Sequence, residues 1–96
     1  MARTRYLVCY DVCHAKRLRR VAKTMEAFGT RIQYSVFECA LDDLRLEKLR
    51  AALHPILHHE EDQVLFVSLG PEDSRHGLRI DAMGLPYLRQ SRVVVV

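Results

Sequence analysis

The chain has a run of apolar residues near its N-terminus that includes a single carboxylate. Residues 6–12 read Tyr-Leu-Val-Cys-Tyr-Asp-Val, and segment 4–12 is apolar on both parities. This pattern is typical of a central β-strand that is covered on both faces. Because burying an isolated charge is very costly, Asp11 must be solvated, cap a helix, form an ion pair or bind a metal.

Helix-like and strand-like segments alternate after this first strand. Residues 14–28 have apolar positions at helical spacing, and Gly29 is predicted to end that helix. Residues 30–41 are either one bent strand or a tight hairpin that breaks near Tyr34–Ser35. Asp42 or Asp43 is predicted to cap a second helix, and residues 63–69 form the next strand.

The segment after Gly70 gives weaker signals. Residues 71–77 are predicted to form an exposed turn, and a weaker strand is expected at 78–83. The last four residues are all valine, and an exposed strand edge of that kind would be adhesive. We therefore expect the valine tail to pair within a sheet, in its own subunit or in a neighbour's.

Length and composition predict one folded domain over residues 1–96. Of these residues 49% are hydrophobic and 28% charged, and no stretch approaches the roughly 20 apolar residues of a membrane span. The element order predicts a sandwich with both helices on one face of the sheet, which leaves an apolar face for a second subunit. Three cysteines without a Cys-x-x-Cys pair, and no secretory signal, predict free thiols and a cytoplasmic protein.

Alternation along the strands predicts which side chains accompany Asp11. On the first strand, Leu7 and Cys9 share its face. The second run is predicted to turn its apolar residues toward the helices; these are Ile32, Tyr34 and Val36. The residues then left on the open face are Arg31, Gln33, Ser35 and Phe37, unless a bulge near Tyr34 changes the parity.

A single carboxylate holds Mg²⁺ poorly, because the ion takes octahedral oxygen coordination. A two-fold dimer, however, would bring two copies of Asp11 together, and a divalent cation would relieve their repulsion. Such a metal could activate a water against a phosphodiester, with Arg31 stabilising the developing charge. The alternative is that Asp11 caps the helix that starts near Cys13 or His14.

Positive charge is concentrated in the first third of the chain. Residues 1–31 hold eight Lys or Arg against two acids, a net charge of +6, whereas residues 32–96 have a net charge of −3. Five of the cations fall on the first helix: Lys16, Arg17, Arg19, Arg20 and Lys23. Repeated by dimer symmetry, they would form a track for a nucleic-acid backbone, although exposed helices are often basic.

Other site patterns are weak. His54 and His58 lie four residues apart and could ligate zinc, but no suitably spaced third ligand completes the set, so solvated histidines are favoured. The sequence contains no phosphate-binding glycine loop and no Gly-x-Ser-x-Gly elbow.

Three segments resemble a known family. They are the 6–12 run with its following basic helix, the segment Gly-Thr-Arg-Ile-Gln-Tyr-Ser-Val-Phe-Glu at 29–38, and Asp-Gln-Val-Leu-Phe-Val at 62–67. In order and spacing they are similar to the small CRISPR-associated adaptation proteins, the Cas-two family. The resemblance covers residues 5–70, and its specific part is the Arg-Ile-Gln-Tyr-Ser-Val-Phe segment.

The resemblance implies an α+β fold: a ferredoxin-like βαββαβ sandwich on an antiparallel sheet, with residues 30–41 split into a hairpin. It also implies a homodimer in which the C-terminal strand, around the valine tail of an extension over about residues 78–96, adds to the other subunit's sheet. Asp11 would be the catalytic residue and would bind Mg²⁺ (or Mn²⁺) at the dimer axis. The residues implied in nucleic-acid binding are Tyr10, Arg17, Arg20, Arg31 and Phe37.

The activity implied by the resemblance is metal-dependent endonucleolytic cleavage of single-stranded RNA or double-stranded DNA. The family also serves as the adaptor between CRISPR integrase subunits during spacer capture. Two alternatives stay open: a non-catalytic nucleic-acid-binding scaffold for the integrase, and a toxin-like ribonuclease of the same fold. No membrane partner is expected.

Overall fold

β1 (Thr4–Asp11) is the middle strand of a five-stranded antiparallel sheet. The computed structural model describes residues 2–70 and 79–88, and within them the strands are ordered β2-β3-β1-β4-β5. The other elements are α1 (Ala15–Glu26), β2 (Thr30–Gln33), β3 (Val36–Leu41), α2 (Asp43–Leu53), β4 (Gln63–Ser68) and β5 (Arg79–Gly84). This order is the ferredoxin-like βαββαβ arrangement with one extra strand at the β4 edge, and it confirms the predicted α+β fold.

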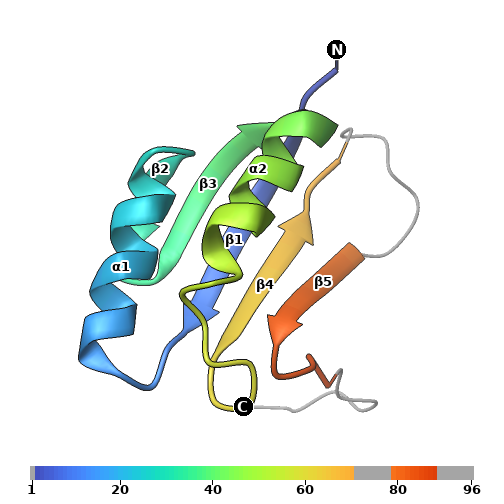
Figure 1. The fold of residues 1–96 in the computed structure, drawn as a ribbon. Coiled ribbons are helices and arrows are strands. Elements are labelled where there is room, and N and C mark those ends of the chain that lie inside the picture. Colours follow the sequence, from blue (N-terminus) through green and yellow to red (C-terminus); the bar gives the residue numbers. More distant parts are fainter. Residues whose placement is uncertain (1, 71–78, 89–96) are drawn as a thin grey trace, which may run out of the picture.

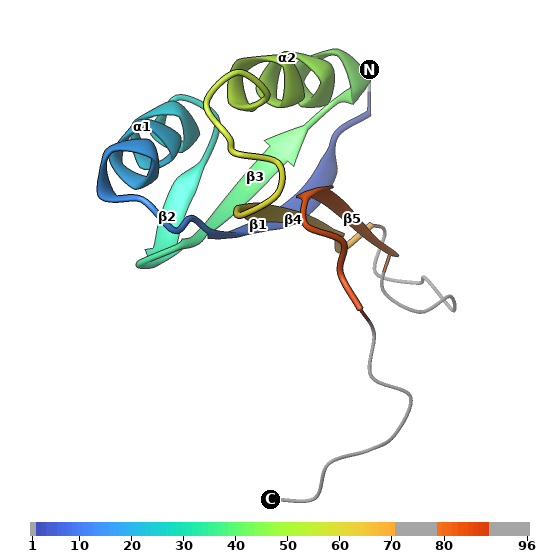
Figure 2. The same cartoon turned by 60° about the horizontal axis from the view of Figure 1, so that its bottom comes forward.

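Both helices cover the same face of the sheet (Figures 1 and 2). The core lies between them and the sheet, and its fully buried side chains include Val8 from β1, Phe37 from β3 and Phe66 from β4. Val21 and Met25 of α1 pack into it from above. Alternate residues of the strands therefore face the helices, and the remaining ones form an open face that no described element covers.

The 30–41 run is a tight hairpin, so one of the two alternatives for it is confirmed. β2 and β3 are joined by the two residues Tyr34 and Ser35, and the pairing register shifts between Arg31 and Gln33. Phe37 pairs with Val8 of β1 and faces the helices, so the predicted assignment of faces in this run is wrong. Ile32 and Tyr34, which were expected to face the helices, are 53% and 73% exposed.

The helix ends show which polar groups act as caps. Asp42 caps α2, and its carboxylate accepts a hydrogen bond from the Arg45 backbone at 2.8 Å. α1 begins after His14, whose Nδ1 accepts a hydrogen bond from the Lys16 backbone at 3.2 Å. The alternative that Asp11 caps this helix is therefore wrong.

Gly29 follows α1 as predicted, but for a different reason. It does not adopt a left-handed conformation, since only Gly70 and Gly84 have positive φ angles in the described part of the chain. A Cβ at Gly29 would instead collide with the Cys39 Sγ and the Glu38 carbonyl oxygen of β3. Glycine is required here because the end of α1 comes very close to the sheet.

The structure tests the predictions for the C-terminal segment only in part. β5 confirms the weaker strand expected near 78–83. The predicted turn at 71–77, the valine tail and its exchange between subunits lie outside the described residues. Cys9, Cys13 and Cys39 are all free thiols, as predicted, with Cys39 buried and Cys13 exposed.

Candidate functional site

Asp11 is the last residue of β1 and lies on the open face of the sheet. It is exposed, and it pairs in register with Gln63 of β4. Its carboxylate forms no ion pair or hydrogen bond with any residue in 2–70 or 79–88. Since it neither caps α1 nor pairs within the described chain, its possible partners are water, a metal or a second chain.

The open face around Asp11 is largely apolar. Leu7 and Cys9 of β1 share its face, Val36 lies opposite Cys9 on β3, and Leu65 lies opposite Cys9 on β4. Val67, Ile80 and Ala82 continue the same surface across β4 and β5. A contiguous apolar sheet face of this kind marks an interaction surface in a folded protein.

Tyr10, Arg31 and Phe37 form a second group, on the helical side of the sheet. The Arg31 guanidinium carbon lies 5.2 Å from the centroid of the Phe37 ring, and the Tyr10 and Phe37 rings stack 6.2 Å apart. The Tyr10 hydroxyl donates to the Tyr34 carbonyl oxygen at 3.4 Å. The structure therefore groups three of the predicted nucleic-acid residues, but on the side of the sheet opposite to Asp11.

Arg31 and Tyr10 line a small cleft of about 190 Å³ between α1 and β2. Tyr34, Leu18 and Arg19 complete most of its wall, so it offers two guanidinium groups around an apolar floor. Burial raises the pKa of Tyr10, an effect that the neighbouring Arg31 partly opposes, so the phenol is neutral at physiological pH. The cleft can therefore hold an anionic group next to a planar apolar one.

Arg17 has a different environment from the one predicted for it. Its Nε donates to Oδ2 of Asp62 at 2.8 Å, and its Nη2 donates to Oδ1 of Asp62 at 3.2 Å and to Oε1 of Glu61 at 3.1 Å. The side chain is only 21% exposed. This forked ion pair ties α1 to the loop before β4 and occupies most of the donors that a phosphate would use.

Asp62 is the buried centre of this network, and sequence reasoning assigned it no role. Its carboxylate also accepts hydrogen bonds from the backbone N–H of Cys13 at 3.0 Å and of His58 at 2.8 Å. Burial opposes its ionisation, but the hydrogen bonds from Arg17, Cys13 and His58 outweigh burial and lower its pKa to about 2. The burial of Asp62 could have been predicted from its spacing, because positions 62, 64 and 66 fall on the same, buried face of the strand.

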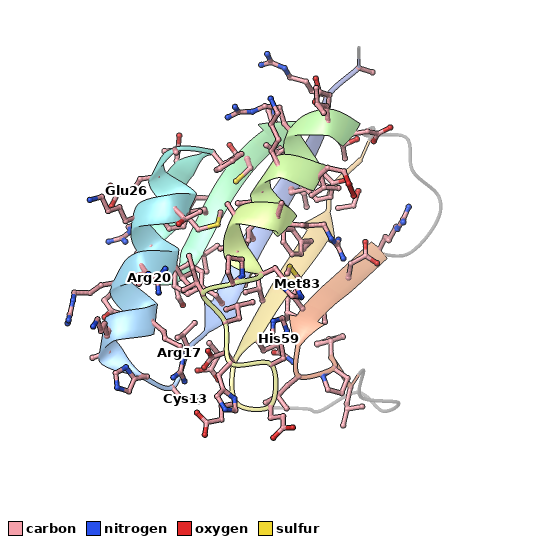
Figure 3. All side chains as sticks on the ribbon, in the orientation of Figure 1. Cys13, Arg17, Arg20, Glu26, His59 and Met83 are labelled. Carbon is pink, nitrogen blue, oxygen red and sulfur yellow. The ribbon has the colours of Figure 1, made fainter. Side chains whose placement is uncertain are left out.

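Arg20 stands one turn further along α1 and is exposed (Figure 3). It has no ion-pair partner in the part of the chain that the structure describes. The exposed cations of α1 also include Lys16, Arg19 and Lys23. Unlike Arg17, these groups are available to a polyanion.

With the residues that the structure describes, His54 and His58 do not form a zinc site, and the alternative of solvated histidines fits the structure. The His54 ring lies 4.6 Å from that of His59 rather than beside His58, and His59 Nε2 is 3.1 Å from the His54 carbonyl oxygen. All three histidines are exposed. Among the described residues, no group of three or more His, Cys, Asp or Glu side chains is placed to hold a metal.

Together these features define a class: a ferredoxin-like sandwich with a lone carboxylate at the exposed end of its central strand and a basic first helix. Comparison with known sequences gives the family. The model of the family described as CRISPR associated protein Cas2 matches residues 4–76. The chain therefore belongs to the Cas2 family. No helix in the described ranges is long and apolar enough to cross a membrane.

Similar proteins carry the same family name. A curated relative from Geobacter sulfurreducens, a CRISPR-associated endoribonuclease Cas2, is 41% identical over 93% of this chain and 96% of its own. One from Rhodospirillum rubrum is 34% identical over 95% of this chain and 88% of its own. The crystal structure of Streptococcus pyogenes Cas2 superposes with a TM-score of 0.65 at 37% identity, covering 69% of this chain and 86% of that one.

Proposed function

We propose that this chain is a metal-dependent endonuclease that hydrolyses phosphodiester bonds in RNA or DNA, with Asp11 as its catalytic residue. The observation that carries the proposal is the exposed Asp11 carboxylate without a partner in the described chain, in a family whose relatives are named endoribonucleases. A carboxylate held on a rigid strand can position a metal or a water against phosphate. We place the protein in the cytoplasm.

The proposed active form is a homodimer that packs through the open face. Leu7, Leu65 and Val67 give that face the apolar character of an interface, and Asp11 lies at its edge. A two-fold interface through this face brings each residue near its own copy when it lies close to the axis. Two Asp11 carboxylates would then share one site, which neither chain forms by itself.

The chemistry of this donor set fits Mg²⁺ or Mn²⁺. One carboxylate from each chain, completed by water and phosphate oxygens, is the hard oxygen environment that these ions prefer. When bound, the ion would supply Lewis acidity and a more acidic water. The chain's own contribution is to hold the Asp11 carboxylates in place and to keep them free of internal partners.

The nucleic-acid surface is proposed on the helical side. Arg20 and the other exposed cations of α1 would contact the backbone, and Arg31 would extend this surface across the edge strand β2. Tyr10 and Phe37 are 5% and 0% exposed, so their role is to hold the Arg31 guanidinium rather than to touch the strand. Arg31 does not lie beside Asp11, so we assign it to binding and not to charge stabilisation at the cleaved bond.

We further propose that the dimer is an adaptor for the integrase subunit in CRISPR adaptation. Membership of the family supports this role. The adaptor needs the dimer and its basic surface but not the Asp11 carboxylate. The two roles therefore separate by substitution.

The test compares native protein, Asp11→Asn and the matched control Asp43→Asn on single-stranded RNA and double-stranded DNA, with and without Mg²⁺. Asp43 is exposed at the start of α2 and lies outside the site. Cleavage that needs Mg²⁺, persists in Asp43→Asn and disappears in Asp11→Asn is expected. If native protein and Asp11→Asn both leave the substrates intact yet support spacer integration, the nuclease proposal fails and the scaffold alternative holds.

A further inference from the structure

A basic cleft lies at the end of the sheet where β1 begins and β3 ends, a region that can be located in Figure 1. It has a volume of about 520 Å³, within the size range of small-ligand sites. Its wall includes Arg3, Arg5, Phe28, Thr30, Glu38 and Arg45. Asp11 is at the other end of β1, about 20 Å from Arg5 by strand geometry. The cleft is therefore separate from the proposed catalytic site, but Arg5 and Glu38 face the same side of the sheet as Leu7, so the cleft borders the face proposed for the dimer.

The charge of the cleft is strongly positive. Arg3, Arg5 and Arg45 contribute three guanidinium groups, and Glu38 contributes the one carboxylate of the wall. None of the three arginines forms an ion pair with a carboxylate anywhere in residues 2–70 or 79–88. Guanidinium groups stay charged at any physiological pH, and their forked N–H donors match phosphate oxygens.

Arg45 is held in place before any ligand arrives. Its guanidinium carbon lies 4.6 Å from the centroid of the Phe28 ring, and its Nη2 donates to the Ala27 carbonyl oxygen at 3.3 Å. A guanidinium stacked on an aromatic ring offers its other face to a planar group, and nucleobases stack on such planes. Ordering this side chain in the free protein reduces the entropy lost when a ligand binds.

The mixture of groups favours a nucleotide over a purely anionic ligand. The arginines supply the phosphate contacts, and the Arg45–Phe28 pair supplies a plane on which a base can stack. An acidic peptide would satisfy the arginines but would leave the stacked Arg45–Phe28 pair without a planar partner.

We propose that this cleft binds a nucleotide that carries a terminal phosphate, with Arg5 and Arg45 holding the phosphate and the base stacking on the Arg45–Phe28 pair. The nucleotide has two possible sources: a free nucleoside monophosphate, or the phosphorylated end of a nucleic-acid strand. The strand-end form rests on the nucleic-acid binding proposed above. The free-nucleotide form stands without it.

The test measures binding of fluorescent single-stranded oligonucleotides by anisotropy in EDTA, so that no cleavage occurs. Strands with a 5′-phosphate, a 3′-phosphate or hydroxyl ends are compared, and AMP and polyglutamate are used as competitors. We expect one phosphorylated strand to bind about tenfold tighter than the hydroxyl strand, because one charge-assisted bidentate contact is gained. AMP should displace it from the cleft.

Arg5→Gln and Arg45→Gln should each abolish that preference. Arg5→Gln removes an exposed side chain and is the safer variant for folding, whereas Arg45→Gln also removes the stack on Phe28. Arg79→Gln is the matched control, since Arg79 is 79% exposed on β5 and lies outside the cleft. It should keep the preference for the phosphorylated strand.

The proposal is overturned if all strand ends bind with equal affinity and AMP does not bind. It is also overturned if the preference for a phosphorylated end survives Arg5→Gln and Arg45→Gln, or if Arg79→Gln abolishes that preference as well. Stronger competition by polyglutamate than by AMP would overturn it too. AMP binding without a strand preference supports the free-nucleotide source. The nuclease proposal fails separately, when native protein does not cleave in Mg²⁺. If the protein cleaves but shows no preference for a phosphorylated end, only the nucleotide-binding proposal is wrong.

Discussion

The Arg17 guanidinium donates from Nε to Oδ2 of Asp62 at 2.8 Å, and the Asp62 side chain is completely buried. This contact joins the first turn of α1 to the residue that precedes β4. It fixes the position of α1 over the sheet, and with it the exposed cations that we assign to nucleic-acid binding. Arg17 therefore stabilises the fold, whereas the exposed cations of α1 are available to bind nucleic acid.

Asp62→Ala should lower the free energy of unfolding by about 3 kcal/mol. The substitution leaves the Arg17 guanidinium and the Cys13 and His58 N–H groups without their acceptor, and breaking a buried pair on one side is strongly destabilising. Urea denaturation followed by circular dichroism measures the change. Glu61→Gln is the control, because Glu61 is 54% exposed in its contact with Arg17 and should have little effect. Equal losses for the two variants would contradict this account.

Stability should fall in acid through the same carboxylate. The pKa of Asp62 is lowered to about 2 in the folded chain, below its ordinary value of 3.8. A lowered folded-state pKa adds stability above the unfolded-state pKa, and that stability is lost as the pH falls through the folded-state pKa. The difference corresponds to about 2 kcal/mol, lost between roughly pH 4 and pH 2.

The measurement is the urea midpoint of native protein and of Asp62→Asn across this pH range. Other carboxylates titrate in both proteins, so the informative quantity is the difference between them. That difference should shrink as the pH falls. A difference that stays constant from pH 4 to pH 2 would show that Asp62 does not carry the linkage.

Gly29→Ala should destabilise the protein by about 1–3 kcal/mol, the usual range for forced overpacking. The added methyl group would meet the Cys39 Sγ and the Glu38 carbonyl oxygen, and the backbone of β3 cannot move aside easily. Thermal unfolding measures the effect. Ala27→Ser, at an exposed position two residues earlier, is the control and should change little. A neutral Gly29→Ala would mean that α1 can move away from β3.

The sequence allowed the fold to be predicted because its strand and helix periods are clear. The run that contains Asp11 indicates a central strand and the stripe on α1 a buried face, and the structure places β1 in the middle of the sheet and Val21 and Met25 in the core. Within the described residues, however, only the helical face of β1 is covered, not both faces as expected.

The hairpin over residues 30–41 is harder to predict. The apolar residues Ile32 and Tyr34 are exposed and therefore do not mark the buried face. The register shift between Arg31 and Gln33 and the turn at Tyr34–Ser35 also break the alternation, so the alternation places Phe37 on the wrong face.

The candidate site could be predicted only in part, because only some of its residues have a local signal in the sequence. Asp11 stands out because it is the one carboxylate in an apolar strand, which is a local signal. The ion pair of Arg17 with Asp62 joins residues 45 positions apart, and no local pattern on α1 distinguishes Arg17 from Arg20. Only the fold shows which arginine has a partner.

The salt dependence of nucleic-acid binding should separate those two arginines. Arg20→Gln should weaken binding and reduce the slope of log affinity against log salt by about 1, because each phosphate contact releases condensed counterions. Arg17→Gln should leave the slope unchanged, since its guanidinium is already occupied by Asp62 and Glu61, and should lower stability instead. Anisotropy titrations over a salt series, at a temperature where both variants are folded, measure the slopes. An equal reduction in the two variants would mean that Arg17 leaves Asp62 to contact phosphate, and the division between fold and surface on α1 would then be wrong.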